Sequence, residues 1–158
     1  MTRQRCTNPA AQLASPATHV YCGRALKAGG TLLETWKVGN CTVTRIEELI
    51  GPLFDPVRFF PEYTPAMFEK HREWLYPIHA DEASGNIISS MHSWLIQTPH
   101  HNILVDTCIG NDKDRMPFHD WHQMQSPWME RLRDTGVGPD DIDFVMCTHL
   151  HVDHVGWN

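Results

Sequence analysis

The run H-x-H-x-D-H at positions 149–154 constrains this chain more than any other feature of its sequence. With eleven histidines among 158 residues, an average window of six holds fewer than one histidine, whereas this window holds three. Residues 141–149, DIDFVMCTH, form a short apolar run that predicts a buried strand, and the histidine run begins at its end. Loops beside such strands commonly carry functional residues. A solvated polar loop is the alternative interpretation, and it leaves this placement unexplained.

The spacing within the run suits metal coordination. In an extended segment, residues i and i+2 point to the same side, so His149 and His151 can converge on one ion. Asp153 and His154 project elsewhere and suit a second ion, because paired metals typically lie about 3.5–4 Å apart. Nitrogen and carboxylate ligands without thiolate favour zinc, with manganese, iron or cobalt as alternatives.

The composition argues against several classes of partner. A net charge of −6 and a pI near 5.9 do not provide the basic face that nucleic acid binding needs. The thirteen Lys and Arg residues are scattered, and no stretch approaches the roughly 20 apolar residues of a membrane span, so no membrane partner is expected. The five cysteines form no CxxC pair, which favours reduced thiols and a cytoplasmic protein.

The N-terminal part of the chain changes character near residue 30. Residues 1–30 show no sustained period and predict a poorly ordered leader, or a start codon placed too far upstream, ahead of one domain over residues 31–158. Two short strands are expected around the turn residues Gly39 and Asn40. The Pro-rich segment 51–63 predicts an irregular aromatic loop.

One helix is predicted over residues 64–77, TPAMFEKHREWLYP. Thr64 can cap its start, a proline suits its first position, and Pro77 limits its end. Met67 and Trp74 are spaced i to i+7, which predicts a shared apolar stripe.

The remaining segments predict a hairpin, with strands over 90–98 and 103–108, and a second helix that Ser126 caps and Gly136 ends. The buried strand and the histidine run follow. This order of elements indicates an α/β fold, or α+β in some schemes.

The H-x-H-x-D-H run, after an apolar strand and a Thr, resembles the signature of the metallo-β-lactamase superfamily. Residues 102–110, NILVDTCIG, are similar to that family's strand ending in an Asp-Thr-x-x-Gly turn, and residues 136–158 are similar to its approach to the site. HVGWN looks more like the lactonase and organophosphate-hydrolase-like branch. The resemblance covers residues 35–158 and implies the N-terminal half of a four-layer αββα sandwich, truncated after the motif.

The resemblance also implies a chemistry. His149 and His151 would bind the first metal, and Asp153 and His154 the second, with two Zn2+ ions per full-length domain or other divalent metals in their place. A hydroxide held by this pair would attack an ester, lactone, amide or phosphoester of a small-molecule substrate, with Asp153 also orienting it. Asp106 would fix a ligand histidine through its other ring nitrogen, unless it only forms the turn.

Further expectations concern the pocket and the extent of the chain. His119 and His122 are candidates for a loop that lines the substrate pocket, with an ordinary exposed loop as the alternative. The later His and Asp ligands of the family's site have no counterpart here, so we expect a fragment of a longer hydrolase that is inactive alone. A non-catalytic histidine-rich metal-binding module stays open, as does a thiolester hydrolase or flavin-linked oxidoreductase of this fold. The substrate and oligomeric state stay undetermined.

Overall fold

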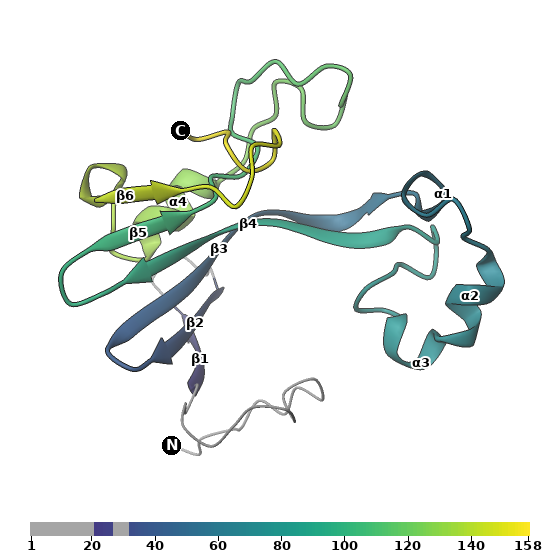
Figure 1. Ribbon diagram of the computed structural model, residues 1–158, viewed down its shortest axis with the longest axis horizontal. Helices are drawn as coiled ribbons and strands as arrows, with labels where there is room; N and C mark the ends of the chain where they lie inside the picture. The colour runs from purple at the N-terminus through teal and green to yellow at the C-terminus, as the bar shows by residue number, and fades with distance from the viewer. Residues whose placement is uncertain (1–20, 27–31) are drawn as a thin grey trace. The chain divides into compact units, whose positions relative to one another are not determined.

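The computed structural model describes residues 21–26 and 32–158, and Figure 1 shows the arrangement of their elements. Six strands follow one another in chain order in a single mixed sheet, and the helices between them are short. In chain order the elements are β1 Tyr21–Leu26, β2 Leu32–Val38, β3 Cys41–Phe54, α1 Pro56–Phe59, α2 Pro65–Lys70, α3 Arg72–Leu75, β4 Ile87–Gln97, β5 Asn102–Val105, α4 Trp128–Asp134 and β6 Phe144–Met146. A 3-10 turn, Pro139–Asp141, precedes β6. The pairs β1–β2, β2–β3 and β4–β5 are antiparallel, whereas β5–β6 is parallel. The predicted α/β class is confirmed.

The described chain divides into two compact units. The first comprises the residues up to Ile46 together with His92–Asn158, and the second comprises Glu47–Met91. The strands β3 and β4 each run from one unit into the other. The histidine run belongs entirely to the first unit.

The core of the first unit lies between the sheet and α4. Leu95 of β4 and Leu104 of β5 are direct partners in the strand register, so their side chains share one face of the sheet. Trp128 and Leu132 lie one turn apart on α4 and are almost completely buried against that face. Complete burial of each aliphatic side chain stabilises the fold by about 1.5–3 kcal/mol.

The predicted hairpin around Gly39 is confirmed. Gly39 has a φ of +58°, a left-handed conformation that glycine adopts without steric cost. Residues 21–26 of the predicted leader pair with β2 as strand β1. Residues 1–20 and 27–30 of that leader lie outside the described residues.

The second unit differs from prediction in its loop and helices. Within the predicted aromatic loop, β3 continues to Phe54 and α1 follows, capped by a hydrogen bond of 3.0 Å from the Val57 amide to Asp55 Oδ1.

Among the described residues, every helix is too short or too polar to cross a membrane.

The prediction of one helix over residues 64–77 is wrong. The helix breaks at His71, whose φ of −112° and ψ of 16° are not helical, and Thr64 makes no capping side-chain hydrogen bond. Met67 and Trp74 are 50% and 59% exposed, so this pair does not form a buried stripe across the break.

The β4–β5 hairpin is confirmed, but β5 ends before the predicted position 108. The chain leaves the extended conformation there because Asp106 and Cys108 adopt positive φ values of 58° and 51°. These left-handed residues turn the backbone sharply at the end of β5, beside the histidine run.

The end of α4 is predicted correctly, but its start is not. Gly136, with a φ of +86°, follows the last helical turn. The capping position is occupied by Pro127 and not by Ser126, whose amide and hydroxyl donate to Asn111 Oδ1, at 2.8 and 3.2 Å.

The strand before the histidine run exists, but the prediction that it is buried is wrong. Phe144, Val145 and Met146 of β6 are each about half exposed, at 53%, 49% and 58%. Within the described sheet, β6 is the terminal strand and pairs with β5 alone. One strand edge and several apolar side chains therefore face solvent in the described chain.

Candidate metal centre

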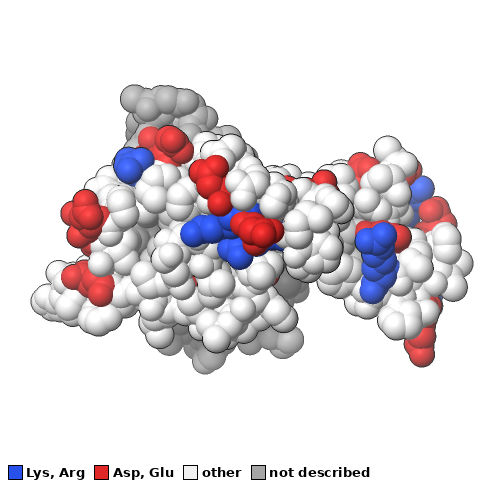
Figure 2. Space-filling model, turned by 90° about the horizontal axis from the view of Figure 1, so that it is seen from above, with Lys and Arg blue, Asp and Glu red and all other residues white. Residues whose placement is uncertain are grey.

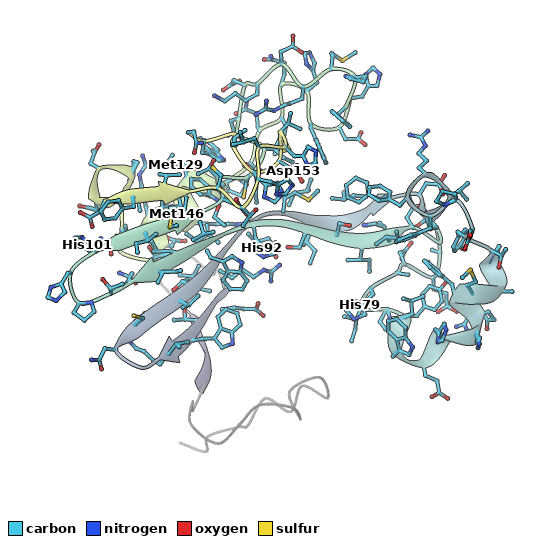
Figure 3. The ribbon with its side chains drawn as sticks, in the orientation of Figure 1. His79, His92, His101, Met129, Met146 and Asp153 are labelled. Atoms are coloured by element: carbon cyan, nitrogen blue, oxygen red, sulfur yellow. The ribbon has the colours of Figure 1, made fainter. Side chains whose placement is uncertain are left out.

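The candidate site lies where two loops meet at the same edge of the sheet. Since β5 and β6 are parallel, their carboxyl ends lie side by side. Asp106 directly follows β5, and residues 148–154 follow β6. Figure 3 labels Asp153 on the second of these loops.

Backbone hydrogen bonds join the two loops at successive positions. They are Asp106 N to Met146 O at 2.8 Å, Thr107 N to His154 O at 2.9 Å, Gly156 N to Cys108 O at 2.8 Å and Trp157 N to Thr107 O at 3.0 Å. This ladder fixes the path of the histidine run relative to the turn after β5. The side chains of that run therefore start from a well-defined backbone.

The same two loops touch backbone to backbone at a pair of glycines. A Cβ added to Gly156 would lie 2.0 Å from the carbonyl carbon and oxygen of Ile109, and a Cβ on Gly110 would lie 2.4 Å from the carbonyl oxygen of Gly156. Gly110 also has a φ of +80°. Only glycine fits at either position without a shift of the backbone.

Asp106 is a buried acceptor beneath the run, with 7% of its surface exposed. Its Oδ1 accepts the Thr148 amide at 2.8 Å, and its Oδ2 accepts the Thr148 hydroxyl at 2.8 Å and lies 2.9 Å from His154 Nδ1. Burial acts to raise the pKa of the Asp106 carboxyl, but these hydrogen bonds and the nearby imidazole outweigh burial and lower that pKa. Asp106 is therefore a carboxylate at neutral pH. The predicted role of Asp106 is to fix a ligand histidine through its other ring nitrogen, and the contact with His154 Nδ1 is the one that this role requires.

The structure brings the predicted ligands into one neighbourhood. The His149 ring lies edge-on to the His151 ring, with centroids 4.7 Å apart, and its centroid is 3.9 Å from that of His154. Asp153 Oδ2 is 3.5 Å from His154 Nε2. His149 and His151 are exposed, while Asp153 and His154 are half-buried.

This donor set fits a divalent metal in chemical type. Three imidazoles and one carboxylate, with no thiolate among them, match the preference of zinc and its neighbours. Within the described part of the chain, however, no three His, Cys, Asp or Glu side chains surround one point closely enough to hold an ion. Catalytic zinc usually takes three protein ligands, and four donors supply only two for each of two ions.

His119 and His122 are not brought into contact with the run by any described interaction. His122 Nδ1 accepts the Arg115 amide at 3.4 Å and lies 3.1 Å from Asp114 Oδ1, within its own loop, and His119 is exposed. Their role in a pocket stays a prediction. An apolar hollow belongs to the second unit and is lined by Phe60, Pro61, Glu62, Tyr63, Met67 and Phe68.

Two residues of the site carried no predicted role. Thr148 contacts Asp106 and two ligand candidates, and its position directly before the run was the available signal. Asn158 Oδ1 accepts the Thr107 hydroxyl at 2.8 Å, and no pattern in the sequence indicates this contact.

On the face shown in Figure 2, Lys and Arg side chains lie among Asp and Glu side chains. Among the described ion pairs, Arg72 pairs with Glu69 at 2.7 Å and with Glu82 at 2.5 Å. Positive charge forms no continuous patch on that face.

A family model described as the metallo-beta-lactamase superfamily matches residues 90–158, from β4 to the end of the histidine segment. Over these residues the chain is similar to the metallo-β-lactamase superfamily. The match includes every residue of the candidate site, so the site lies in the part of the chain with the clearest relationship to the metallo-β-lactamase superfamily.

Two curated relatives are N-acyl homoserine lactonases named AiiB, from Agrobacterium fabrum strain C58 and Rhizobium rhizogenes strain K84. Each is 36% identical to this chain over a region that covers 40% of the chain and 27% of the relative. This chain therefore spans about a quarter of the length of these relatives.

Three solved structures show a similar fold over most of the chain. Hydrolase AbOPH matches with a TM-score of 0.54 and 21% identity, covering 77% of this chain and 37% of that one. A probable metal-dependent hydrolase from Staphylococcus aureus matches with 0.56 and 26%, covering 75% and 40%. AidC, a dizinc quorum-quenching lactonase, matches with 0.55 and 19%, covering 77% and 37%. The fold of this chain therefore matches less than half of each of these longer chains.

Proposed function

We propose that this chain carries part of the dinuclear metal centre of a hydrolase. His149 and His151 would hold the first metal, and Asp153 and His154 the second. The observation that best supports this proposal is the gathering of these four donors above the buried Asp106 carboxylate. Zinc is the metal that the donor set suits best, with other divalent metals as alternatives.

The chemistry depends on both the metals and the residues around them. When bound, a metal pair lowers the pKa of water to about 7 and polarises the substrate oxygen that gains charge. The Asp106 carboxylate holds the His154 ring by its Nδ1 atom. The other ring nitrogen, Nε2, then points away from Asp106 and is the nitrogen available to a metal. The Asp153 carboxylate, 3.5 Å from that Nε2, would orient the attacking water.

The substrate class is proposed from the relatives. Ester, lactone, amide and phosphoester centres all suit a hydrolytic metal pair. Two curated relatives and one structural neighbour are named as lactonases, which favours a small-molecule lactone. A phosphotriester comes second, in keeping with the organophosphate-hydrolase-like character of HVGWN.

We further infer that residues 1–158 are catalytically silent on their own. The run supplies two donors per metal, and catalytic zinc usually needs three from the protein. A non-catalytic metal-binding module is the second candidate function. It is favoured by the histidine-rich run itself, which offers donors for a metal but fewer than the three that catalytic zinc usually takes.

The test uses the full-length protein that carries this sequence. Its metal is removed with a chelator and restored with zinc, and hydrolysis of a lactone and of a phosphotriester is followed throughout. We expect activity to disappear and return with the metal, equally in the native protein and in the control variant His100→Ala, which changes an exposed hairpin histidine. Activity that survives metal removal would refute the proposal, and tight metal binding without any turnover would favour the module.

A further inference from the structure

The Thr148 hydroxyl lies at the centre of the polar contacts beneath the histidine run. Its Oγ1 is 2.8 Å from Asp106 Oδ2, 3.1 Å from His149 Nδ1 and 3.4 Å from His154 Nδ1. One exposed hydroxyl thus touches the buried carboxylate and two of the three clustered rings. The Thr148 amide holds the other carboxylate oxygen at 2.8 Å, which anchors the residue independently of its side chain.

The hydrogens in this group can be counted. A hydroxyl carries one hydrogen, and an ionised carboxylate carries none and only accepts. The Thr148 hydrogen therefore goes to Asp106 Oδ2, and the Thr148 oxygen is left to accept. In a neutral imidazole one nitrogen donates and the other accepts. His149 Nδ1, facing an oxygen that can only accept, must carry the ring hydrogen.

The same reasoning applies to His154. Its Nδ1 atom is 2.9 Å from Asp106 Oδ2, which has no hydrogen to give. The other ring nitrogen, Nε2, also faces a carboxylate oxygen, Asp153 Oδ2, but at the longer distance of 3.5 Å. The ring hydrogen therefore sits on Nδ1, at the shorter contact, and the lone pair sits on Nε2. Both rings would then present the same free nitrogen, Nε2, although the two residues lie five positions apart in the sequence.

We propose that the Thr148 hydroxyl is a positioning group that sets the tautomer of His149 and, together with Asp106, that of His154, so that both rings offer Nε2 to the metals. The role of the two Nε2 atoms as metal ligands rests on the proposed function, whereas the hydrogen bonds that set the tautomers do not depend on it. The hydrogen that one nitrogen donates decides which nitrogen is free to bind metal. A ring already in the correct tautomer need not exchange its hydrogen before it binds.

Two substitutions separate the hydroxyl from the shape of the side chain. Thr148→Val keeps the branched shape and loses the hydroxyl, whereas Thr148→Ser keeps the hydroxyl and loses a methyl group. Both leave in place the hydrogen bond from the Thr148 backbone amide to Asp106 Oδ1. Because the Thr148 side chain is exposed, neither change opens a cavity in the core.

The direct readout is ¹⁵N NMR of the imidazole nitrogens in the metal-free full-length protein near pH 8, where histidines of ordinary pKa are neutral. We expect His149 and His154 with the hydrogen on Nδ1 in the native protein. In Thr148→Val, His149 shifts toward the Nε2–H form that free imidazole side chains prefer in water, and Thr148→Ser retains the native pattern. The exposed His100 serves as an internal reference that stays constant in all three proteins.

Zinc affinity is the second readout. Losses of outer contacts to ligand histidines typically weaken metal binding about 10–100-fold, so Thr148→Val should fall in that range while Thr148→Ser stays near native. A native His149 with its hydrogen on Nε2, or a Thr148→Val protein with an unchanged tautomer, would overturn the inference, even if zinc affinity fell. The tautomer is measured without metal or turnover, so a tautomer shift in a protein that fails to hydrolyse any substrate would refute the proposed function and support the role of Thr148.

Discussion

Trp128 and Trp157 stack face to face, with ring centroids 5.2 Å apart and an angle of 17° between their planes. Trp128 lies on α4 in the core with 1% of its surface exposed, and Trp157 follows the last histidine of the run by three residues. The stack therefore packs the end of the histidine segment against the buried core of the first unit. Such aromatic pairs contribute about 0.5–1.5 kcal/mol beyond the area they bury.

Replacing Trp157 with Ala should remove this tie. We expect the free energy of unfolding to fall by about 1–3 kcal/mol, because a large half-buried ring and its stacking partner are lost. Trp157→Phe keeps an aromatic ring and should lose less. Urea denaturation followed by circular dichroism measures both. Equal stability of the Ala variant and the native protein would show that the stack does not anchor the segment.

Gly156→Ala should displace one of the two loops that form the candidate site. Its new Cβ would lie 2.0 Å from the Ile109 carbonyl, so one of the two loops must move. Overpacking of this kind typically costs about 1–3 kcal/mol, and we expect zinc affinity to fall as well because the histidine run shifts. Gly51→Ala is the control, since its Cβ would meet only Leu53 at an ordinary 3.6 Å. Native stability and zinc affinity in Gly156→Ala would contradict the close contact.

Asp106→Asn should weaken metal binding while preserving the fold. Asn has the same shape and tolerates the positive φ of 58° at this position. It offers His154 Nδ1–H a weaker acceptor than a carboxylate, so metal affinity should fall about 10–100-fold. Asp140→Asn, a change of an exposed aspartate outside the site, should leave affinity at the native level. Isothermal titration with zinc compares the three proteins. Equal zinc affinities in all three proteins would show that Asp106 only forms the turn after β5.

Residues 1–158 on their own should self-associate through β6. Phe144, Val145 and Met146 are half exposed on a terminal strand, which combines apolar surface with an open strand edge. Val145→Lys places a charge on that strand and should shift the sedimentation profile toward monomer. Phe59→Lys, a similar change at an exposed aromatic of the second unit, should have less effect. A native chain that sediments as a monomer at high concentration would contradict this expectation.

The local elements that the sequence predicts best are those set by backbone chemistry. The turn at Gly39 and the helix end at Gly136 each need a left-handed residue, and glycine supplies it at both. The site neighbourhood was also predictable in outline, because Asp106 and the histidine run each follow an apolar strand. Two strands paired in parallel bring such segments to the same edge of a sheet.

Features that depend on packing between distant segments could not be predicted. An apolar run such as 144–146 indicates a strand, but nothing in its period says whether another layer covers it. The i to i+7 spacing of Met67 and Trp74 likewise indicates a stripe only if something packs against it. The contact of Gly110 with Gly156 joins positions 46 residues apart, so each glycine alone reads as an ordinary turn residue.

The run 149–154 is proposed to bind the metals of a hydrolase, and replacement of His151 removes one of the proposed ligands. His151 is exposed, so His151→Ala should leave the fold intact. The measurement is the metal content per chain of the purified full-length protein by elemental analysis, in parallel with lactone hydrolysis, for native, His151→Ala and the control His100→Ala. We expect the native protein and His100→Ala to hold equal amounts of metal, and His151→Ala to lose metal together with nearly all activity. Unchanged metal content and hydrolysis in His151→Ala would contradict the claim.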